Sequence, residues 1–159
     1  MSKSITQSTI SKLVIAAIAL GNAGSTLYLP AFPIMAEELH TSNLNIQLTL
    51  SCFLIGFSFS QLLYGPLSDA FGRKINLLVG LIIFCIGSLI CMLTPGITLL
   101  IIGRLIQGIG IGSANAVGYA LMRDIYLGHT LTKQLSYVSI FVGITPLIAP
   151  LMGGYIVQY

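Results

Sequence analysis

Residues 65–74 read Gly-Pro-Leu-Ser-Asp-Ala-Phe-Gly-Arg-Lys and form the densest cluster of charge in a chain that otherwise avoids it. Only 7% of the 159 residues are charged and 55% are hydrophobic, whereas soluble domains carry about 25% charged residues. Long apolar runs flank this cluster on both sides, so it is predicted to be a short polar turn between two membrane spans. The chain is therefore expected to be an all-α, polytopic membrane protein.

Five apolar runs are long enough to cross a ~30 Å hydrocarbon core as helices, which takes about 20 residues each. They cover roughly residues 13–35, 44–67, 75–93, 99–121 and 135–157. Besides the turn at 65–74, short polar connections are predicted at 37–43, 94–98 and 124–133. The first run is longer than the ~7–15 apolar residues of a signal peptide, which favours a retained span over a cleaved signal.

The basic residues indicate an orientation. Six of the seven fall on one side of this topology, namely Lys3, Lys12, Arg73, Lys74, Arg123 and Lys133. The loops on the opposite side hold none. The positive-inside rule then predicts a cytoplasmic N-terminus and, after five spans, a Tyr159 at the outer face.

Arg104 is the one basic residue that topology does not explain, because it lies within the fourth span, ~8 Å from its outer end at 1.5 Å per residue. Such an arginine either snorkels to the interface or faces a polar bundle interior. The four acidic residues, Glu37, Glu38, Asp69 and Asp124, all lie at span ends or in loops. If Arg104 faces inward, as we expect, its partners are neutral polar groups or water.

Small residues and prolines mark the fourth and fifth spans. Gly108 and Gly112 have the small-xxx-small spacing that lets two helix backbones approach closely. The fifth span carries Gly143, Pro146, Pro150, Gly153 and Gly154. That pattern fits either a kinked packing helix or a bend that opens and closes a path.

No residue cluster indicates catalysis. Cys52, Cys85 and Cys91 lie within apolar runs without metal-ligand spacing and are expected to pack as small apolar residues. His40 and His129 are predicted on opposite sides of the membrane, so they cannot share a site. We therefore expect neither an enzyme nor a cofactor or metal site, and no nucleic-acid partner.

Four motifs, each in the matching span, resemble those of the major facilitator superfamily of transporters, and in particular its bicyclomycin-resistance (Bcr/CflA) type of drug exporters. The resemblance covers nearly the whole chain. Its residues are Gly65, Asp69, Gly72, Arg73 and Lys74 after the second span; Arg104, Gln107, Gly108, Gly110 and Gly112 in the fourth; Gly143, Pro150, Gly153 and Gly154 in the fifth; and residues 28–33 with Arg123 and Asp124.

The resemblance implies a proton-driven exporter of twelve helices in two six-helix halves, of which residues 1–159 would be the first five helices. It implies substrate or proton handling around Arg104, with Gln107, Thr26 and Tyr28 as candidate participants. It also implies a cytoplasmic turn whose Asp69 contacts a helix of the other half, and a fifth span that takes part in switching. The expected partners are lipid, a small-molecule substrate, protons and a C-terminal portion, which either belongs to a longer product of the same gene or is separately encoded. The expected location is the bacterial inner membrane.

The chain departs from this family in two ways. Relatives typically carry an aspartate at the position of Thr26, and threonine cannot carry a proton. Helix rise places Thr26 ~20 Å from the inner face of a ~30 Å core, near the depth of Arg104, so we expect relatives to pair an acid with the arginine there. The second departure is length, because a cavity between two halves needs more than five helices.

These departures leave other hypotheses open. One is a membrane remnant that transports nothing, and another is one piece of a split transporter. A nutrient importer of the same superfamily fits the fifth-span motif less well. Tyr28 and Phe32, near the outer end of the first span, are also typical of aromatic residues at the membrane interface.

Overall fold

The computed structural model describes the backbone of residues 2–158 and the side chains of residues 9–157. Its elements are α1 (Ser2–Thr26), the 3-10 turn η1 (Leu29–Ala31), α2 (Phe32–Glu38), α3 (Asn43–Phe71), α4 (Arg73–Met92), α5 (Ile97–Ile125) and α6 (Gly128–Gln158). Five stretches of this part are helical, long and apolar enough to cross a membrane, which confirms the predicted all-α membrane bundle. The Lys3 side chain and Tyr159, used above to predict orientation, lie outside the described residues.

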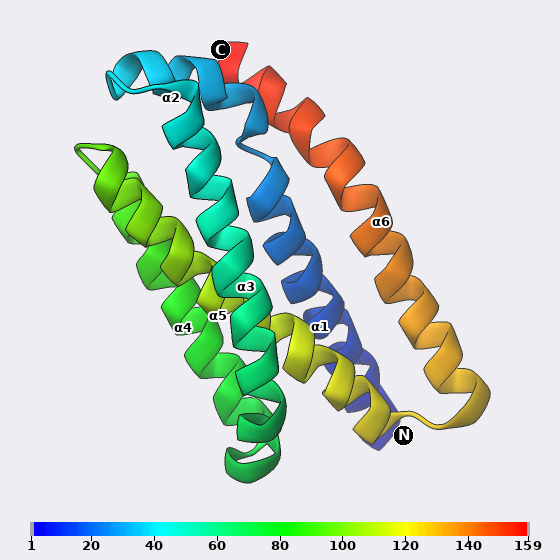
Figure 1. Cartoon of the computed structure of the whole chain (residues 1–159). Helices are drawn as coiled ribbons and strands as arrows, with labels where there is room; N and C mark the ends of the chain where they lie inside the picture. Colours follow the sequence, from blue (N-terminus) through cyan, green and yellow to red (C-terminus); the bar gives the residue numbers. More distant parts are fainter. Residues whose placement is uncertain (1, 159) are drawn as a thin grey trace.

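The long helices run alongside one another between two ends of the bundle (Figure 1). The N-terminal end of α1, the α3–α4 turn and the α5–α6 turn share one end, at the bottom of Figure 1, and α2 crosses the other. Arg73 and Lys74 begin α4, and Arg123 lies in the last turn of α5. The fold therefore gathers these basic residues at one end, which we call the basic end.

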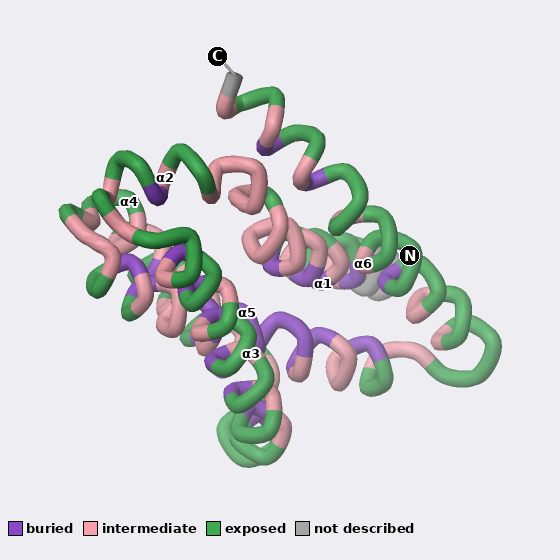
Figure 2. Tube along the Cα trace, turned by 45° about the horizontal axis from the view of Figure 1, so that its top comes forward, coloured by how far each residue is buried: buried purple, intermediate pink, exposed green. Residues whose placement is uncertain are grey.

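The core of the bundle is α5, which packs between α3 and α4. Buried residues are densest in the middle of α5, over residues 107–118, and colour part of this helix purple in Figure 2. A Cβ atom on Gly108 would overlap the Phe53 carbonyl oxygen of α3, and one on Gly110 would lie 2.7 Å from the Gly80 carbonyl oxygen of α4. Gly112 lies as tightly against Ser60. The close packing predicted from Gly108 and Gly112 is confirmed.

A second cluster of buried side chains joins α1 to α5 and α6. It consists of Val14, Ile18, Met122 and Val138. All four lie toward the basic end, where they fasten α6 to α1 and α5. At the opposite end α6 also contacts η1. The rest of α6 is largely exposed (Figure 2).

The first predicted span, residues 13–35, lies within the apolar stretch Thr9–Glu38, but this stretch is not one unbroken α-helix. α1 ends at Thr26, and the chain continues through η1 into the short helix α2. Pro30 and Pro33 explain the break, because proline lacks an N–H donor and disfavours helical conformation in the residue before it. The break leaves α2 lying across the end of the bundle (Figure 1).

Two predicted polar connections are also mostly helical. α3 continues to Phe71 and α4 starts at Arg73, so the turn expected over 65–74 shrinks to Gly72, whose φ of 90° favours glycine. α5 runs to Ile125 and α6 begins at Gly128, so the connection expected over 124–133 shrinks to two residues. Polar residues mark where a span leaves the hydrocarbon, but the helix continues beyond that point.

α6 is a continuous helix although it contains Pro146 and Pro150. Each proline removes one backbone donor, so the carbonyl oxygens of Val142 and Pro146 lose their usual helical hydrogen bond. Membrane helices tolerate this where neighbouring groups or water satisfy the freed carbonyls.

Candidate functional site

Arg104 extends from α5 toward α1. Its Nη1 donates a hydrogen bond to the carbonyl oxygen of Gly24 (3.1 Å), and its guanidinium carbon lies 3.5 Å from the centre of the Tyr28 ring. The side chain is half-buried. Arg104 therefore faces the bundle interior rather than snorkelling, and its contacts are neutral, as the positions of the acidic residues predicted.

Tyr28 is fixed by contacts on three sides. Besides the guanidinium of Arg104, its ring meets that of Phe32 with centroids 5.0 Å apart, and its hydroxyl lies 3.3 Å from Oγ1 of Thr49 on α3. Thr49 donates its only hydroxyl proton to the Ile46 carbonyl oxygen (2.6 Å), so the Tyr28 hydroxyl must be the donor to Thr49. Tyr28, two residues after the end of α1, thus contacts α2, α3 and α5, which is more than an interfacial aromatic does.

Gln107 lies on α5 three residues after Arg104 but contacts α4. Its Nε2 donates to Ser88 Oγ (2.8 Å), and its Oε1 accepts from the Cys91 thiol (3.7 Å). The side chain is buried. Within the described residues no hydrogen bond joins Gln107 to Arg104 or Tyr28, so the structure does not bring these predicted site residues together.

Thr26 lies at the level of Arg104, since Arg104 contacts Gly24 and Tyr28 on either side of it in sequence. Its hydroxyl donates to the Asn22 carbonyl oxygen of its own helix (3.3 Å). Two residues along a helix turn a side chain by about 200°, so Thr26 and Gly24 face different directions. That relatives pair an acid at this position with the arginine stays a prediction.

At the basic end, Arg73 joins three helices. Its Nε donates to Asp124 Oδ2 at the end of α5 (2.9 Å), and its Nη1 lies 2.6 Å from Asp69 Oδ1 on α3. Nη1 also donates to the hydroxyl of Ser68. Both carboxylates are more than half exposed. The predicted loop signature is therefore a joint between α3, α4 and α5.

Asn76 completes this joint and was missed from the sequence. It is buried, and its Nδ2 donates to the carbonyl oxygens of Leu67 and Gly72, each at 3.0 Å. An amide one turn into an apolar span was the signal available. Gly65 takes part through its backbone, since its carbonyl oxygen accepts a hydrogen bond from Ser68 Oγ (2.8 Å). Lys74 is exposed and is not among the residues that form the joint.

The fifth-span motif divides into a packed part and an open part. A Cβ on Gly153 would overlap the Leu27 carbonyl oxygen, and Gly154 lies beside Pro30, so the C-terminal part of α6 packs on the break after α1. Pro150 is half-buried. Gly143 and Pro146 are exposed, and nothing lies within 4 Å of a Cβ on Gly143.

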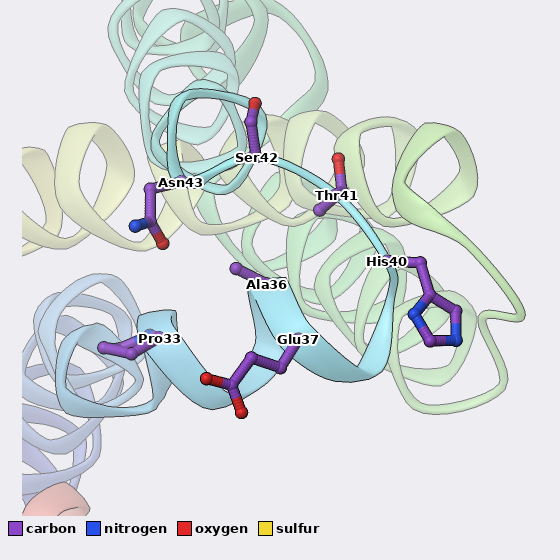
Figure 3. Close-up of a pocket in the computed structure, with 7 residues that line it drawn as sticks. All are labelled: Pro33, Ala36, Glu37, His40, Thr41, Ser42 and Asn43. Carbon is purple, nitrogen blue, oxygen red and sulfur yellow. The ribbon is translucent and has the colours of Figure 1, made fainter.

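Two hollows accompany these sites. One of about 440 Å³ lies between α2 and the start of α3, where the side chains of Glu37 and His40 point in different directions (Figure 3). The other, of about 410 Å³, lies between α1 and α6 and is lined by apolar side chains such as Leu20, Leu27 and Phe141. No group of three or more metal-ligating side chains occurs in the part of the chain that the structure describes.

Comparison with known proteins decides the family. The sequence model described as the Major Facilitator Superfamily matches residues 14–159. The chain belongs to the Major Facilitator Superfamily. This superfamily consists of transporters, and the membership predicted from the sequence motifs is confirmed.

Several curated relatives resemble the chain. An uncharacterized MFS-type transporter of Bacillus subtilis, YdgK, is 37% identical over 86% of this chain and 34% of its own length. Multidrug resistance protein D of Escherichia coli is 34% identical over 89% of the chain and 36% of its length. The bicyclomycin resistance protein homolog of Haemophilus influenzae is 34% identical over 86% of the chain and 34% of its length. The chain thus spans about a third of the length of these relatives.

Proposed function

We propose that this chain forms the first five helices of a proton-driven exporter of drugs or other small molecules. The observation that carries the proposal is Arg104, which is held inward between α5 and α1 although a charged side chain in a membrane interior is costly. Relatives named for multidrug resistance and for bicyclomycin resistance support export over import. The bacterial inner membrane, with a cytoplasmic basic end, is the proposed location.

Within this proposal Arg104 handles the substrate or the proton, and Tyr28 fixes the plane of its guanidinium. Gln107 contributes by holding α4 against α5, next to the helical turn that carries Arg104. Thr26 cannot carry a proton, so the coupling proton would bind to a group at another position. None of these residues is assigned a catalytic role, and no cofactor is required.

The joint at the basic end and the C-terminal part of α6 are the proposed moving parts. Asp69 and Asp124 share Arg73, and both carboxylates remain open to a further partner. A helix from the other half of the transporter would compete for Asp69 and loosen α3 from α5. Gly153, pressed against Leu27, would let α6 slide over the break after α1.

The remaining helices of the transporter are proposed partners of this chain. Transporter sites of this class lie between two halves, which five helices do not supply. The exposed middle of α6, around Gly143 and Pro146, offers a face for such a partner. Either a longer product of the same gene or a separately encoded polypeptide would meet this need.

Drug accumulation in an efflux-deficient bacterium tests the proposal. Cells would express either this chain alone or this chain with the coding sequence downstream of it, and uptake of a fluorescent drug would be followed with and without a protonophore. We expect lowered accumulation only with the longer product, abolished by Arg104→Ala and by the protonophore but not by Lys133→Ala, which changes an exposed cation. Unchanged accumulation with the longer product would overturn the proposal.

The alternative is a membrane remnant that does not transport. In this alternative the open face of α6 around Gly143 has no partner. It predicts that no downstream frame encodes further spans and that Arg104→Ala has no effect on accumulation under any condition.

A further inference from the structure

Arg104 has more hydrogen-bonding capacity than its surroundings use. A guanidinium carries five N–H donors, and only Nη1 has a hydrogen-bond partner among the described residues. Nε is buried and has none there. Nη2 also has none in this part of the chain, but it is not among the buried atoms. One edge of the guanidinium, formed by Nη2 and Nε, is therefore unoccupied by protein acceptors.

The charge of Arg104 is equally uncompensated. Glu37 and Glu38 belong to α2, which crosses the end of the bundle, and Asp69 and Asp124 lie at the basic end, paired with Arg73. The nearest groups are the Gly24 carbonyl and the Tyr28 ring, both neutral. A cation removed from water is stabilised when an anion with matching hydrogen-bond geometry joins it.

The guanidinium is also held in a defined position. Tyr28 covers one of its faces and is itself anchored through Thr49 and Phe32, while Gly24 holds Nη1. An arginine edge with two parallel N–H donors matches the two oxygens of a carboxylate. The Tyr28 ring that covers the guanidinium face is held in turn by Phe32, with ring centroids 5.0 Å apart.

From this geometry we infer that the Arg104–Tyr28 site binds the carboxylate of a small organic acid. Nη2 makes the first contact with the acid. Nε is buried, so a small movement of the side chain must uncover it before it becomes the second donor of a two-point contact. The inference rests on the proposed function in that it names a substrate class for the same site. It predicts that the exporter prefers acids over neutral or cationic compounds of similar size.

Binding to the purified chain tests this without any transport. The chain would be placed in lipid nanodiscs with ¹⁵N-labelled arginine, which gives Nε signals from only Arg73, Arg104 and Arg123. Benzoate would be titrated, with benzamide as a neutral probe and benzyltrimethylammonium as a cationic one. We expect benzoate to shift the Arg104 signal saturably. The affinity for benzamide and for benzyltrimethylammonium should be at least tenfold weaker, and the Arg123 signal should stay unchanged with all three probes.

Variants separate the two-point contact from charge alone. Arg104→Lys keeps the charge but loses the paired donors, so benzoate affinity, followed through ring protons of the ligand, should fall at least tenfold. Arg123→Lys is the matched control and should leave affinity unchanged.

The outcomes also separate this inference from the proposed function. If benzoate and benzamide shift Arg104 alike, or neither does so saturably, the inference is wrong even if the longer product exports drugs. If benzoate binds as expected but neither this chain nor the longer product lowers drug accumulation, the site is an anion site and the exporter proposal fails.

Discussion

α5 and α6 are similar in length, 29 and 31 residues, and both are apolar and rich in glycine, yet they differ in how the bundle uses them. Half of an apolar 18-residue stretch of α5 is buried, against 11% of the corresponding stretch of α6. Gly108 and Gly110 of α5 meet backbone of α3 and α4, whereas nothing lies within 4 Å of a Cβ built on Gly143 of α6. Glycine content therefore does not decide burial; the presence of a partner helix within the same chain does.

The largest difference in stability between the two helices is expected when a glycine near the middle of each is replaced by leucine. Gly110→Leu forces a side chain into the backbone of α4 and should lower the free energy of unfolding by more than ~3 kcal/mol, beyond the usual cost of overpacking. Gly143→Leu should change it by less than ~1 kcal/mol, as surface substitutions usually do. Unfolding by SDS titration in mixed micelles, followed by circular dichroism, measures both. Equal losses for the two variants would mean that α6 is enclosed as tightly as α5.

Filling the glycine of α6 that packs on the break after α1 should destabilise the protein, as filling the glycines of α5 does. Gly153→Ala places a methyl group against the Leu27 carbonyl and should cost about 1–3 kcal/mol. Gly143→Ala is the control and should be neutral or stabilising by up to ~1 kcal/mol, because alanine favours helix. The same titration checks this pair; a neutral Gly153→Ala would show that the end of α6 is not packed.

The next largest difference is expected between a tyrosine that contacts α5 and a tyrosine of α6, in the free energy of unfolding lost when each is replaced by leucine. Tyr28→Leu removes the ring under Arg104 of α5 and the hydrogen bond to Thr49, at a cost of about 2 kcal/mol. Tyr137→Leu changes an exposed ring of α6 and should cost less than ~0.5 kcal/mol. Thermal unfolding of both variants in one detergent would reveal the difference. A larger shift for Tyr137→Leu would contradict the Arg104–Tyr28 contact.

The smallest change in the free energy of unfolding is expected at the basic end, where α5 is followed by α6. Asp124→Asn removes one carboxylate from Arg73, and because the pair is exposed the cost should be less than ~1 kcal/mol and should shrink in high salt. His129→Gln at the start of α6 should show no salt-dependent change. SDS titrations at low and high salt distinguish them. A cost that does not depend on salt would point to packing rather than charge.

The sequence predicted the features that depend on local pattern. Spans followed from apolar runs, close packing of α5 from the spacing of Gly108 and Gly112, and the inward direction of Arg104 from its depth. These succeed because the cost of burying charge and the approach of helix backbones are set by residue type and spacing.

The features that the sequence did not predict depend on tertiary contacts. The pairing of Arg73 with Asp124 joins residues 51 positions apart. Gln107 turns toward Ser88 because α4 packs on that side of α5, which spacing alone does not reveal. The early end of α1 at Thr26 was missed because residues 27–35 are apolar enough to extend a span, although Pro30 and Pro33 signalled the break.

The contrast between an enclosed α5 and an open α6 is tested most directly in a bilayer. The chain, labelled with ¹⁵N-glycine in lipid nanodiscs, would be exposed to a lipid carrying a nitroxide near the middle of its acyl chain, and the broadening of each glycine signal measured. Gly110 and Gly143 both lie near the middle of their helices. We predict strong broadening for Gly143 and little for Gly110. Equal broadening, or the reverse order, would contradict this architecture.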